Sequence, residues 1–400
     1  MNLRYRNGLL CLVIAATLAT SAACGESDDP APAVDVSKLD AGNYPTTPRD
    51  IDKQRTAETG AVQESIRLAE FVPLMMDLDS RLIYNHRPFY LHPFTPQNPP
   101  RNGWLGGSVE NFSAAAPGLV VGWTTAGHRR KDNSLGLNID LTLLRFSNNA
   151  QAKNAMDVFS DEKNDKYPRK GPLAIPGYPN AKSVLSQYDA VETWIARDDY
   201  LLYTYVGNNL ATPPDPAPLI DFTKKLFDKQ FELLKGYTPT PSDKVAQEPA
   251  DIDGLVARTL PNQPSEGYAD ITGAYTPHAA LHLEERPDIT ERAFDDAEVD
   301  LIAHSDSSIY RTADSAAAAR LTASLLDQLA GLFQTTDSPP GLPTAKCSKK
   351  LDNDATKSRS LVEFICYLPY DRYVAAITAN QRQDLDQKLA AQYKLLAFDK

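Results

Sequence analysis

Two histidines four residues apart, His278 and His282, have the spacing of a metal-binding pair, and Glu284 and Glu285 follow them. A catalytic zinc site needs three protein ligands, whereas this segment supplies two histidines without the glutamate that directly follows the first histidine in metalloprotease helices. The four-residue spacing places both rings on one face of a helix or a strand alike. We therefore expect no metal and no cofactor here, with a metal pair as the minor alternative.

The usual signatures of catalysis are missing from the sequence. It contains no phosphate-binding loop, no G-x-G-x-x-G and no G-x-S-x-G elbow, and Gly106-Gly107-Ser108 is typical of a turn. The acid pairs Asp198-Asp199 and Asp295-Asp296 are also typical of solvated turns, because consecutive carboxylates point apart and a glycosidase needs them to converge. The sequence therefore predicts a protein that is not an enzyme.

A cluster of basic and aromatic residues forms the candidate binding surface. It lies in a long proline-rich segment between Arg87 and Trp104 that is expected to run over the surface of its domain. The candidates are His86, Arg87, Tyr90, His92, Arg101 and Trp104. The alternative is that this long loop uses its aromatic side chains only to attach itself to the domain.

Two cysteines, Cys347 and Cys366, are candidates for a disulfide. Cys347 directly follows the segment GLPTAK, and Cys366 lies in the next strand-like segment. An exported chain with two remaining thiols most often oxidises them to each other. Closing a loop of about 20 residues stabilises a fold by about 3 kcal/mol.

The first 23 residues have the features of an export signal. Arg4 and Arg6 precede a short apolar run that is too short to span a membrane, and small residues lead directly into Cys24. This resembles the lipobox of bacterial lipoproteins, so Cys24 is the predicted lipidation site and 1–23 the signal peptide. The protein is then expected at the cell membrane, lipid-anchored on the extracytoplasmic face. An ordinary secretory signal cleaved near Ala23 is the alternative.

Composition favours an acidic globular chain behind a tether. Fifty-two acidic and 41 basic residues give a net charge of −11, which repels nucleic-acid phosphates and excludes that class of partner. Residues 24–49 are rich in Pro, Asp, Ser and Gly without periodicity, and are expected to form a flexible tether.

The elements that would position these residues occur twice. A strand at 137–146, a capping cluster at Ser147-Asn148-Asn149 and an amphipathic helix are matched by 308–311, Thr312-Ala313-Asp314 and a second helix. GYPNAK at 177–182 returns as GLPTAK at 341–346, and a strand pair and a closing helix follow in both halves. We interpret the chain as an internal duplication.

The predicted fold is α+β, with two similar domains that are each an antiparallel sheet with helices packed on one face. The N-terminal domain spans 50–237 and includes a leading helix near Gln63–Phe71. A proline-rich and acidic linker spans 238–267, and the C-terminal domain with its disulfide spans 268–400.

These features together resemble an uncharacterised two-domain family of actinobacterial cell-envelope lipoproteins, of the Nocardia and Rhodococcus type, whose domains have no known function. The resemblance rests on the lipobox, the two alike halves, the join at Tyr310–Asp314 and the segments at Pro343–Cys347 and Cys366–Ala375. It implies the envelope location and the two-domain organisation, and it supplies no catalytic residue.

We therefore expect a membrane-anchored extracytoplasmic lipoprotein that binds a ligand or partner without catalysis. An envelope lipid, a small molecule or a protein are the candidate partners, and the cleft between the halves and the 87–104 segment are the candidate places. An extracytoplasmic hydrolase with an unrecognised active site is the alternative, and a purely structural or adhesive protein is the third.

Overall fold

The computed structural model describes residues 34–85, 92–131, 135–164, 168–262, 272–353 and 362–398. The chain divides after Val34, and the unit that begins at Asp35 contains all the elements below. Within the described ranges, no helix is both long and apolar enough to cross a bilayer.

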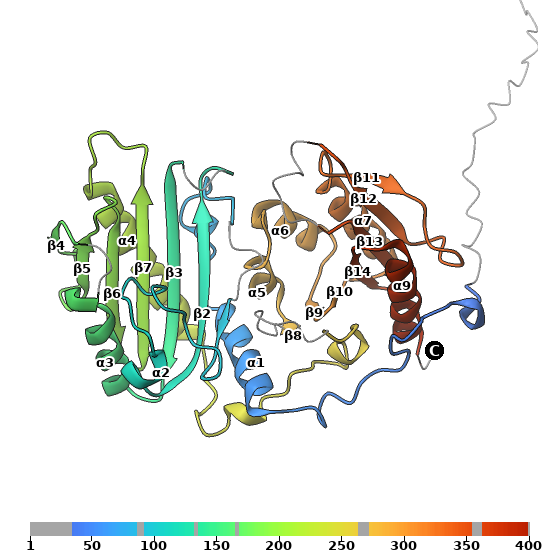
Figure 1. Ribbon diagram of the computed structural model, residues 1–400, viewed down its shortest axis with the longest axis horizontal. Helices are drawn as coiled ribbons and strands as arrows, with labels where there is room; N and C mark the ends of the chain where they lie inside the picture. The colour runs from blue at the N-terminus through green and yellow to red at the C-terminus, as the bar shows by residue number, and fades with distance from the viewer. Residues whose placement is uncertain are drawn as a thin grey trace, which may run out of the picture. The chain divides into compact units, whose positions relative to one another are not determined.

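The first half forms a seven-stranded antiparallel sheet (Figure 1). In sheet order its strands are β1 (Pro93–Phe94), β2 (Leu119–His128), β3 (Leu137–Phe146), β7 (Tyr200–Asn208), β6 (Val191–Arg197), β5 (Lys182–Leu185) and β4 (Gly171–Leu173). The long central strands β3 and β7 pair over nine residues, from Leu137 opposite Asn208 to Arg145 opposite Tyr200. They form the framework on which the other strands are built.

The second half repeats this topology strand for strand. In sheet order its strands are β8 (Gly273–Tyr275), β9 (Leu301–His304), β10 (Ser307–Arg311), β14 (Tyr373–Ala379), β13 (Phe364–Tyr370), β12 (Lys346–Lys350) and β11 (Phe333–Thr336). Each strand number is seven higher than that of its counterpart in the first sheet. The predicted duplication and the α+β class with two similar domains are confirmed.

Local details are duplicated as well. The β6–β7 and β13–β14 hairpins turn at Asp198 and Asp371, whose φ angles are 53° and 52°. The end of the partner strand donates an N–H to the turn in both halves, from Phe146, the last residue of β3, to Asp199 O at 2.7 Å and from Thr312, directly after β10, to Arg372 O at 2.9 Å. Asp198-Asp199 is thus a hairpin tip, as predicted.

The helices of the described chain connect and cover these strands. They are α1 (Ala57–Ala69), α2 (Phe112–Ala115), α3 (Asn149–Phe159), α4 (Ala217–Leu233), α5 (Pro277–Leu281), α6 (Pro287–Asp296), α7 (Ser315–Asp327) and α9 (Arg382–Ala397). The predicted capping residues begin two of them: Asn148 Oδ1 accepts from Gln151 N at 3.0 Å, and Asp314 Oδ1 accepts from Ala317 N at 2.8 Å. The leading helix α1 begins six residues before its predicted start.

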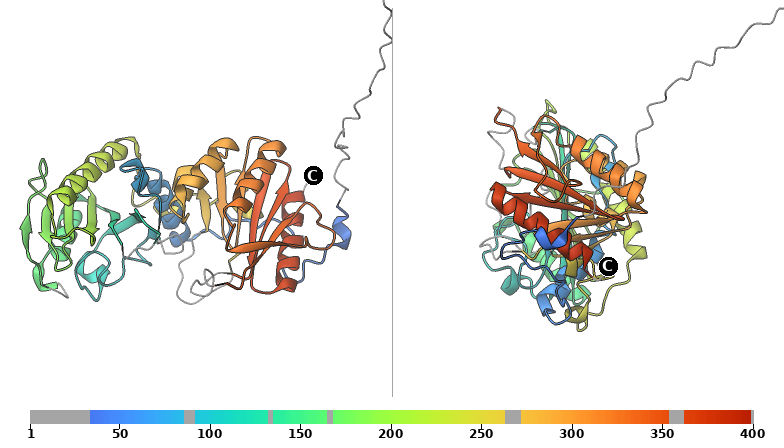
Figure 2. Two further views of the ribbon diagram at one scale, coloured as in Figure 1. Left: turned by 90° about the horizontal axis from the view of Figure 1, so that it is seen from above. Right: turned by 90° about the vertical axis from the view of Figure 1, so that its right-hand side faces the viewer.

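Helices cover both faces of each sheet, and not one face as predicted. Along β3, Leu141 and Leu143 pack in one core with α4, whereas Leu144 and Phe146 pack in another with α3. In the second sheet, Tyr310 packs in a core with α7, while the Ser307 hydroxyl on the other face bonds to Gln392 of α9 at 2.6 Å. Figure 2 shows the helices on opposite sides of the second sheet. No residue of β3 is exposed, although Asn138, Asp140 and Thr142 alternate with apolar residues in it, as expected of a strand in a sheet that is covered on both faces.

Helix α1 lies between the two sheets, against β2 of the first and β8 of the second (Figure 1). The Gln63 amide pairs with both backbone groups of Ala274 on the outer edge of β8, donating to its O at 2.8 Å and accepting from its N at 3.1 Å. Ser65 donates its hydroxyl to Gly122 O of β2. One apolar core includes side chains of α1 and of both halves, so α1 fills this part of the expected cleft.

Residues 35–49 differ from the predicted tether. They form the short 3-10 helix η1 (Val36–Lys38) and then pack on the second half, where Leu39 and Ala41 are only 6% and 7% exposed. Two buried apolar residues among many polar ones were too weak a pattern to detect in the sequence. The rest of the predicted tether, before Val34, lies outside the described residues.

Candidate functional site

The candidate surface of basic and aromatic residues is only partly described. His86, Arg87 and Tyr90 lie outside the described residues. His92 is fully buried: its Nδ1 lies 2.6 Å from Thr124 O, and its ring stacks on Trp123 at 5.4 Å between centroids. His92 therefore cannot line an exposed surface as predicted, because the pairing of β1 with β2 brings it into the core.

The two remaining candidates of that set lie in the loop after β1. Arg101 is exposed, and Trp104 is half-buried with its ring edge-on to Phe94 at 5.8 Å. Ser108 donates its hydroxyl to Asn102 Oδ1 at 3.1 Å within the same loop, so Gly106-Gly107-Ser108 is a turn and shows no nucleophile geometry. These contacts attach the loop to the domain, as the alternative interpretation expects.

The histidine pair joins the two halves of the chain. His282 Nδ1 lies 2.8 Å from Thr125 Oγ1 of β2, its Nε2 lies 3.3 Å from Ala69 O of α1, and His278 Nε2 lies 2.8 Å from Val72 O. Burial, and secondly the nearby His278 and His92, hold the pKa of His282 well below its usual range. Across the described ranges, no three His, Cys, Asp or Glu side chains come together to hold a metal.

The predicted disulfide between Cys347 and Cys366 is present, between directly paired residues of β12 and β13. The equivalent pair in the first sheet is Ser183 and Thr193, also directly opposite each other. The Ser183 hydroxyl donates to Thr193 Oγ1 at 3.0 Å. One site of the repeat thus carries a covalent bond in one copy and a hydrogen bond in the other.

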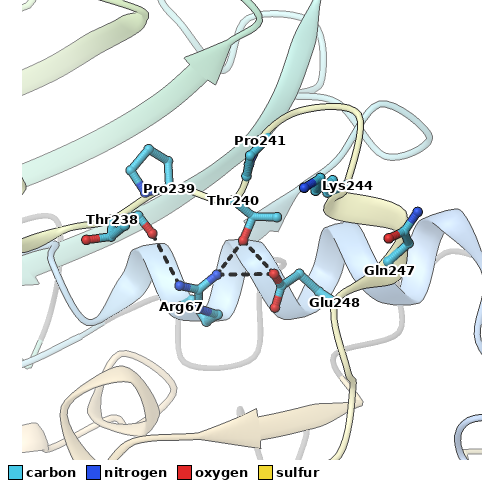
Figure 3. Close-up of a pocket in the computed structure, with 8 residues that line it drawn as sticks. All are labelled: Arg67, Thr238, Pro239, Thr240, Pro241, Lys244, Gln247 and Glu248. Atoms are coloured by element: carbon cyan, nitrogen blue, oxygen red, sulfur yellow. Dashed lines mark hydrogen bonds and ion pairs between the residues drawn. The ribbon is translucent and has the colours of Figure 1, made fainter.

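A pocket of about 510 Å³ lies between α1 and the chain that follows the first domain (Figure 3). Its lining residues are Arg67, Thr238, Pro239, Thr240, Pro241, Lys244, Gln247 and Glu248. This volume is within the range of small-molecule sites, and the pocket is a shallow one that is widely open to solvent. Sequence reasoning placed all but Arg67 in a linker and missed the pocket.

The predicted linker is closely packed where the structure describes it. Val245, at the start of the short helix η5 (Val245–Gln247), is buried, and so are Ala250 and Leu255 farther along. A Cβ at Gly60 of α1 would lie 2.2 Å from Val245 O, so only glycine permits this close approach. The linker is thus a fixed wall of the pocket.

A buried ion-pair network holds two residues that line the pocket, Arg67 and Thr240. Glu64 of α1 is fully buried and accepts from Thr240 N at 2.8 Å, and its Oε1 lies 3.3 Å from Nη1 of Arg145, whose side chain is 6% exposed. The Tyr237 hydroxyl also donates to Glu64 at 2.5 Å, and burial, followed by the Glu64 charge, raises the pKa of Tyr237. A buried carboxylate with this many donors is strongly held in place.

The pocket presents both occupied and available polar groups. Arg67 is engaged by Glu64, by Thr240 Oγ1 at 2.6 Å and by Glu248 at 3.5 Å. Lys244 and Gln247 are exposed, and their side chains make no hydrogen bond or ion pair with any described residue (Figure 3). Among the residues that line the pocket, Arg67 and Lys244 are cationic and Glu248 is anionic, so the lining has a small excess of positive charge.

One signal in the sequence could have indicated this site. Gln63, Glu64 and Ser65 interrupt the apolar residues of α1, and all three are buried. Buried polar residues in a helix need partners from elsewhere in the chain. The partners themselves, Ala274, Thr240 and Gly122, could not be found from spacing, because they are distant in sequence.

Two family models match the chain. Residues 51–250 match the model described as Domain of unknown function (DUF7373) N-terminal, and residues 255–399 match the corresponding C-terminal model. The chain belongs to the DUF7373 family. The two DUF7373 matches correspond to the two sheets. The boundary between them, at 250–255, lies in the same linker that lines the pocket. No curated protein and no solved structure matches the chain.

Proposed function

We propose that this DUF7373 protein is a lipid-anchored extracytoplasmic lipoprotein that binds a ligand or partner without catalysing a reaction, as an actinobacterial cell-envelope protein. The pocket between α1 and the linker is the proposed binding site. The leader with Cys24 at its end supports the anchor. The buried disulfide supports an oxidising compartment.

The observation that carries the binding proposal is the available Lys244 ammonium beside Thr240, which a buried hydrogen-bond network holds in place. Because Glu64 and Arg145 fix Thr240 in place, the pocket keeps its shape without a ligand and loses little entropy on binding. An anionic group, such as a carboxylate or a phosphate, would be received by Lys244 and by the Gln247 amide. The proposed ligand is therefore small and polar, or a segment of a partner that carries such a group.

Binding is tested by thermal unfolding with inorganic phosphate, succinate and glutamate as probes, in wild type and two variants. We expect at least one probe to raise the unfolding temperature of the wild type, and Lys244→Gln to lose more than half of that rise. Lys229→Gln is the matched control, since Lys229 is exposed on α4 of the same half. An equal rise in Lys244→Gln, or no rise with any probe, argues against the pocket.

The anchor is tested separately, by intact mass and detergent partition of the full chain expressed in an actinobacterial host. We expect the mature protein to begin at an acylated Cys24 and to enter the detergent phase. The Cys24→Ala variant should lack the acyl mass and remain in the aqueous phase. A wild-type protein that is cut near Ala23 and not acylated contradicts the anchor and leaves the pocket proposal standing.

A further inference from the structure

Residues 35–49, here called the strap, connect the N-terminal segment to the second half of the molecule. The strap begins at η1 and runs along α9. Its contacts are specific and are spread over its whole length, so it is held as a part of the second half.

Three contacts fix the first part of the strap to α9. Lys394 donates to Leu39 O at 2.8 Å, the Tyr44 hydroxyl donates to Asp384 Oδ1 at 2.5 Å, and Lys388 lies 5.9 Å from the centre of the Tyr44 ring. A Cβ at Gly42 would lie 2.6 Å from the Gln387 side chain, which shows how closely the backbone approaches the helix. These contacts combine hydrogen bonds to charged groups with a cation–π contact.

Arg49 fixes the other end of the strap. Its Nη2 donates to Val256 O at 3.1 Å and to Thr259 Oγ1 at 2.9 Å, and its backbone N donates to Ala257 O at 3.0 Å. Val256 and Ala257 belong to the short helix η6 (Val256–Arg258), which α9 also contacts. A force on the chain before Asp35 is therefore transmitted through the strap to the second half.

Chain length limits how far a lipid on Cys24 can lie from the strap. Eleven residue steps separate Cys24 from Asp35. A chain spans at most about 3.3–3.6 Å per residue, so η1 lies within about 40 Å of an acylated Cys24 whatever the conformation between them.

We propose that the strap makes the second half the membrane-facing half, with a phospholipid bilayer lying against the surface at η1 and the neighbouring turn 338–346. Gly341 of that turn lies next to Leu39, since a Cβ there would be 3.1 Å from the Leu39 side chain. The inference rests on the proposed anchor at Cys24.

The chemistry of this surface fits the headgroup region of an anionic bilayer. Val36 is 39% exposed, and Lys346 is exposed and makes no ion pair with a described residue, whereas the exposed Lys38 is paired with Asp35 at 3.1 Å. Lysines beside a small exposed apolar residue interact favourably with anionic headgroups, whereas an acidic chain as a whole is repelled by them. The surface at η1 and 338–346 is thus the part of this acidic protein that we expect to lie against an anionic bilayer.

The test uses the acylated full chain in vesicles of phosphatidylcholine and phosphatidylglycerol that contain a phosphatidylethanolamine with a photoactivatable headgroup. Lipid adducts are mapped by peptide mass spectrometry after irradiation. We expect most adducts on residues 35–49 and 338–346, at least threefold above those on residues 182–208 of the first half. Adducts spread evenly over both halves, or concentrated on the first half, overturn the proposal.

Releasing the strap provides the matched comparison. Tyr44→Ala removes the bond to Asp384, and we expect it to lower the ratio of second-half to first-half adducts at least twofold. Tyr178→Ala removes an equivalent hydroxyl–carboxylate bond of 2.7 Å, to Asp228 in the first half, and should leave that ratio unchanged. Equal ratios in Tyr44→Ala and wild type contradict the strap as the orienting element, provided that both variants keep the wild-type unfolding temperature.

Intact mass separates this inference from the proposed function. An unacylated protein that does not bind vesicles contradicts the anchor itself. An acylated, vesicle-bound protein with its adducts on the first half leaves the anchor in place and contradicts only the role of the strap.

Discussion

Two histidines, the fully buried His282 and the half-buried His304, make the stability of this protein depend on pH. Burial lowers the pKa of His304 to about 4, and it lowers that of His282 well below the usual range. An unfolded histidine takes up a proton near pH 6.5, while the buried rings take one up only at lower pH. The neutral rings therefore give their full contribution to stability above about pH 6.5, and that contribution is lost as the pH falls.

The histidine prediction concerns the slope of stability with pH. Below pH 6.5, each buried histidine should lower the free energy of unfolding by up to about 1.4 kcal/mol per pH unit. His304→Gln should remove the contribution of one histidine to the slope of the free energy of unfolding against pH between pH 6.5 and 4.5. Urea unfolding at several pH values in this range measures the slope. A variant whose slope equals that of the wild type contradicts a depressed pKa at this residue.

The contribution of Glu284 to stability depends on pH in the opposite direction. Burial raises the pKa of its carboxyl to about 7, against a partial lowering by a hydrogen bond from Thr290. The folded protein therefore holds a proton that the unfolded chain releases near pH 4.5, so stability falls as the pH rises from about 4.5 to 7. Glu284→Gln keeps the shape and removes this loss.

The glutamate prediction is a pH-dependent gain in stability. At pH 8 the Glu284→Gln variant should have a free energy of unfolding higher than the wild type by an amount on the order of 1–3 kcal/mol. At pH 4 the two proteins should be nearly equal, because the wild-type carboxyl is then neutral in both states. Urea unfolding at the two pH values decides the matter, and a gain of the same size at pH 4 would show that the cause is not ionisation.

At the scale of single elements, the two repeats offer a natural exchange experiment. Cys347 and Cys366 occupy the positions of Ser183 and Thr193, and both pairs lie directly opposite each other on adjacent strands. The double variant Cys347→Ser/Cys366→Thr copies the first half into the second. We expect it to fold, with a loss of about 2–4 kcal/mol, since a hydroxyl pair does not close the 19-residue loop.

This exchange is measured by chemical unfolding of the oxidised wild type, the reduced wild type and the double variant. The reduced protein and the double variant should lose similar amounts of stability and keep the same circular dichroism. Failure of the double variant to fold, while the reduced wild type folds, would falsify the equivalence of the two sites.

The repeated elements were predictable because their signals are local. The capping residues Asn148 and Asp314, the hairpin tips and the segments before β5 and β12 each depend on neighbouring residues. The two-sided covering of the sheets was not predictable in the same way, because the alternation of Asn138, Asp140 and Thr142 with apolar residues in β3 is typical of a strand with one polar face. The strap and the pocket were missed because their contacts, such as that between Lys394 and Leu39, join residues far apart in sequence.

The whole molecule is predicted to unfold as one cooperative unit, although its two halves arose as repeats. Helix α1 belongs to the first half in sequence and pairs with the edge of the second sheet through Gln63. A single apolar core includes residues of α1, of the first sheet and of α5–α7. The first half also has a core of its own around α3, but the core at α1 is common to both halves, and we therefore expect the halves to unfold together.

Gln63→Ala tests this coupling. It leaves the N–H and C=O of Ala274 without their partner in a buried position, which should lower the free energy of unfolding by about 2–4 kcal/mol. Calorimetry of the wild type should show one transition, and hydrogen exchange should show that β6 and β13 lose protection together in wild type and variant alike. Gln383→Ala on the exposed face of α9 is the control. It should change neither the free energy of unfolding nor the joint loss of protection of β6 and β13. If instead β13 keeps its protection while β6 loses it, the halves are independent domains, and α1 is a contact between them and not a shared element.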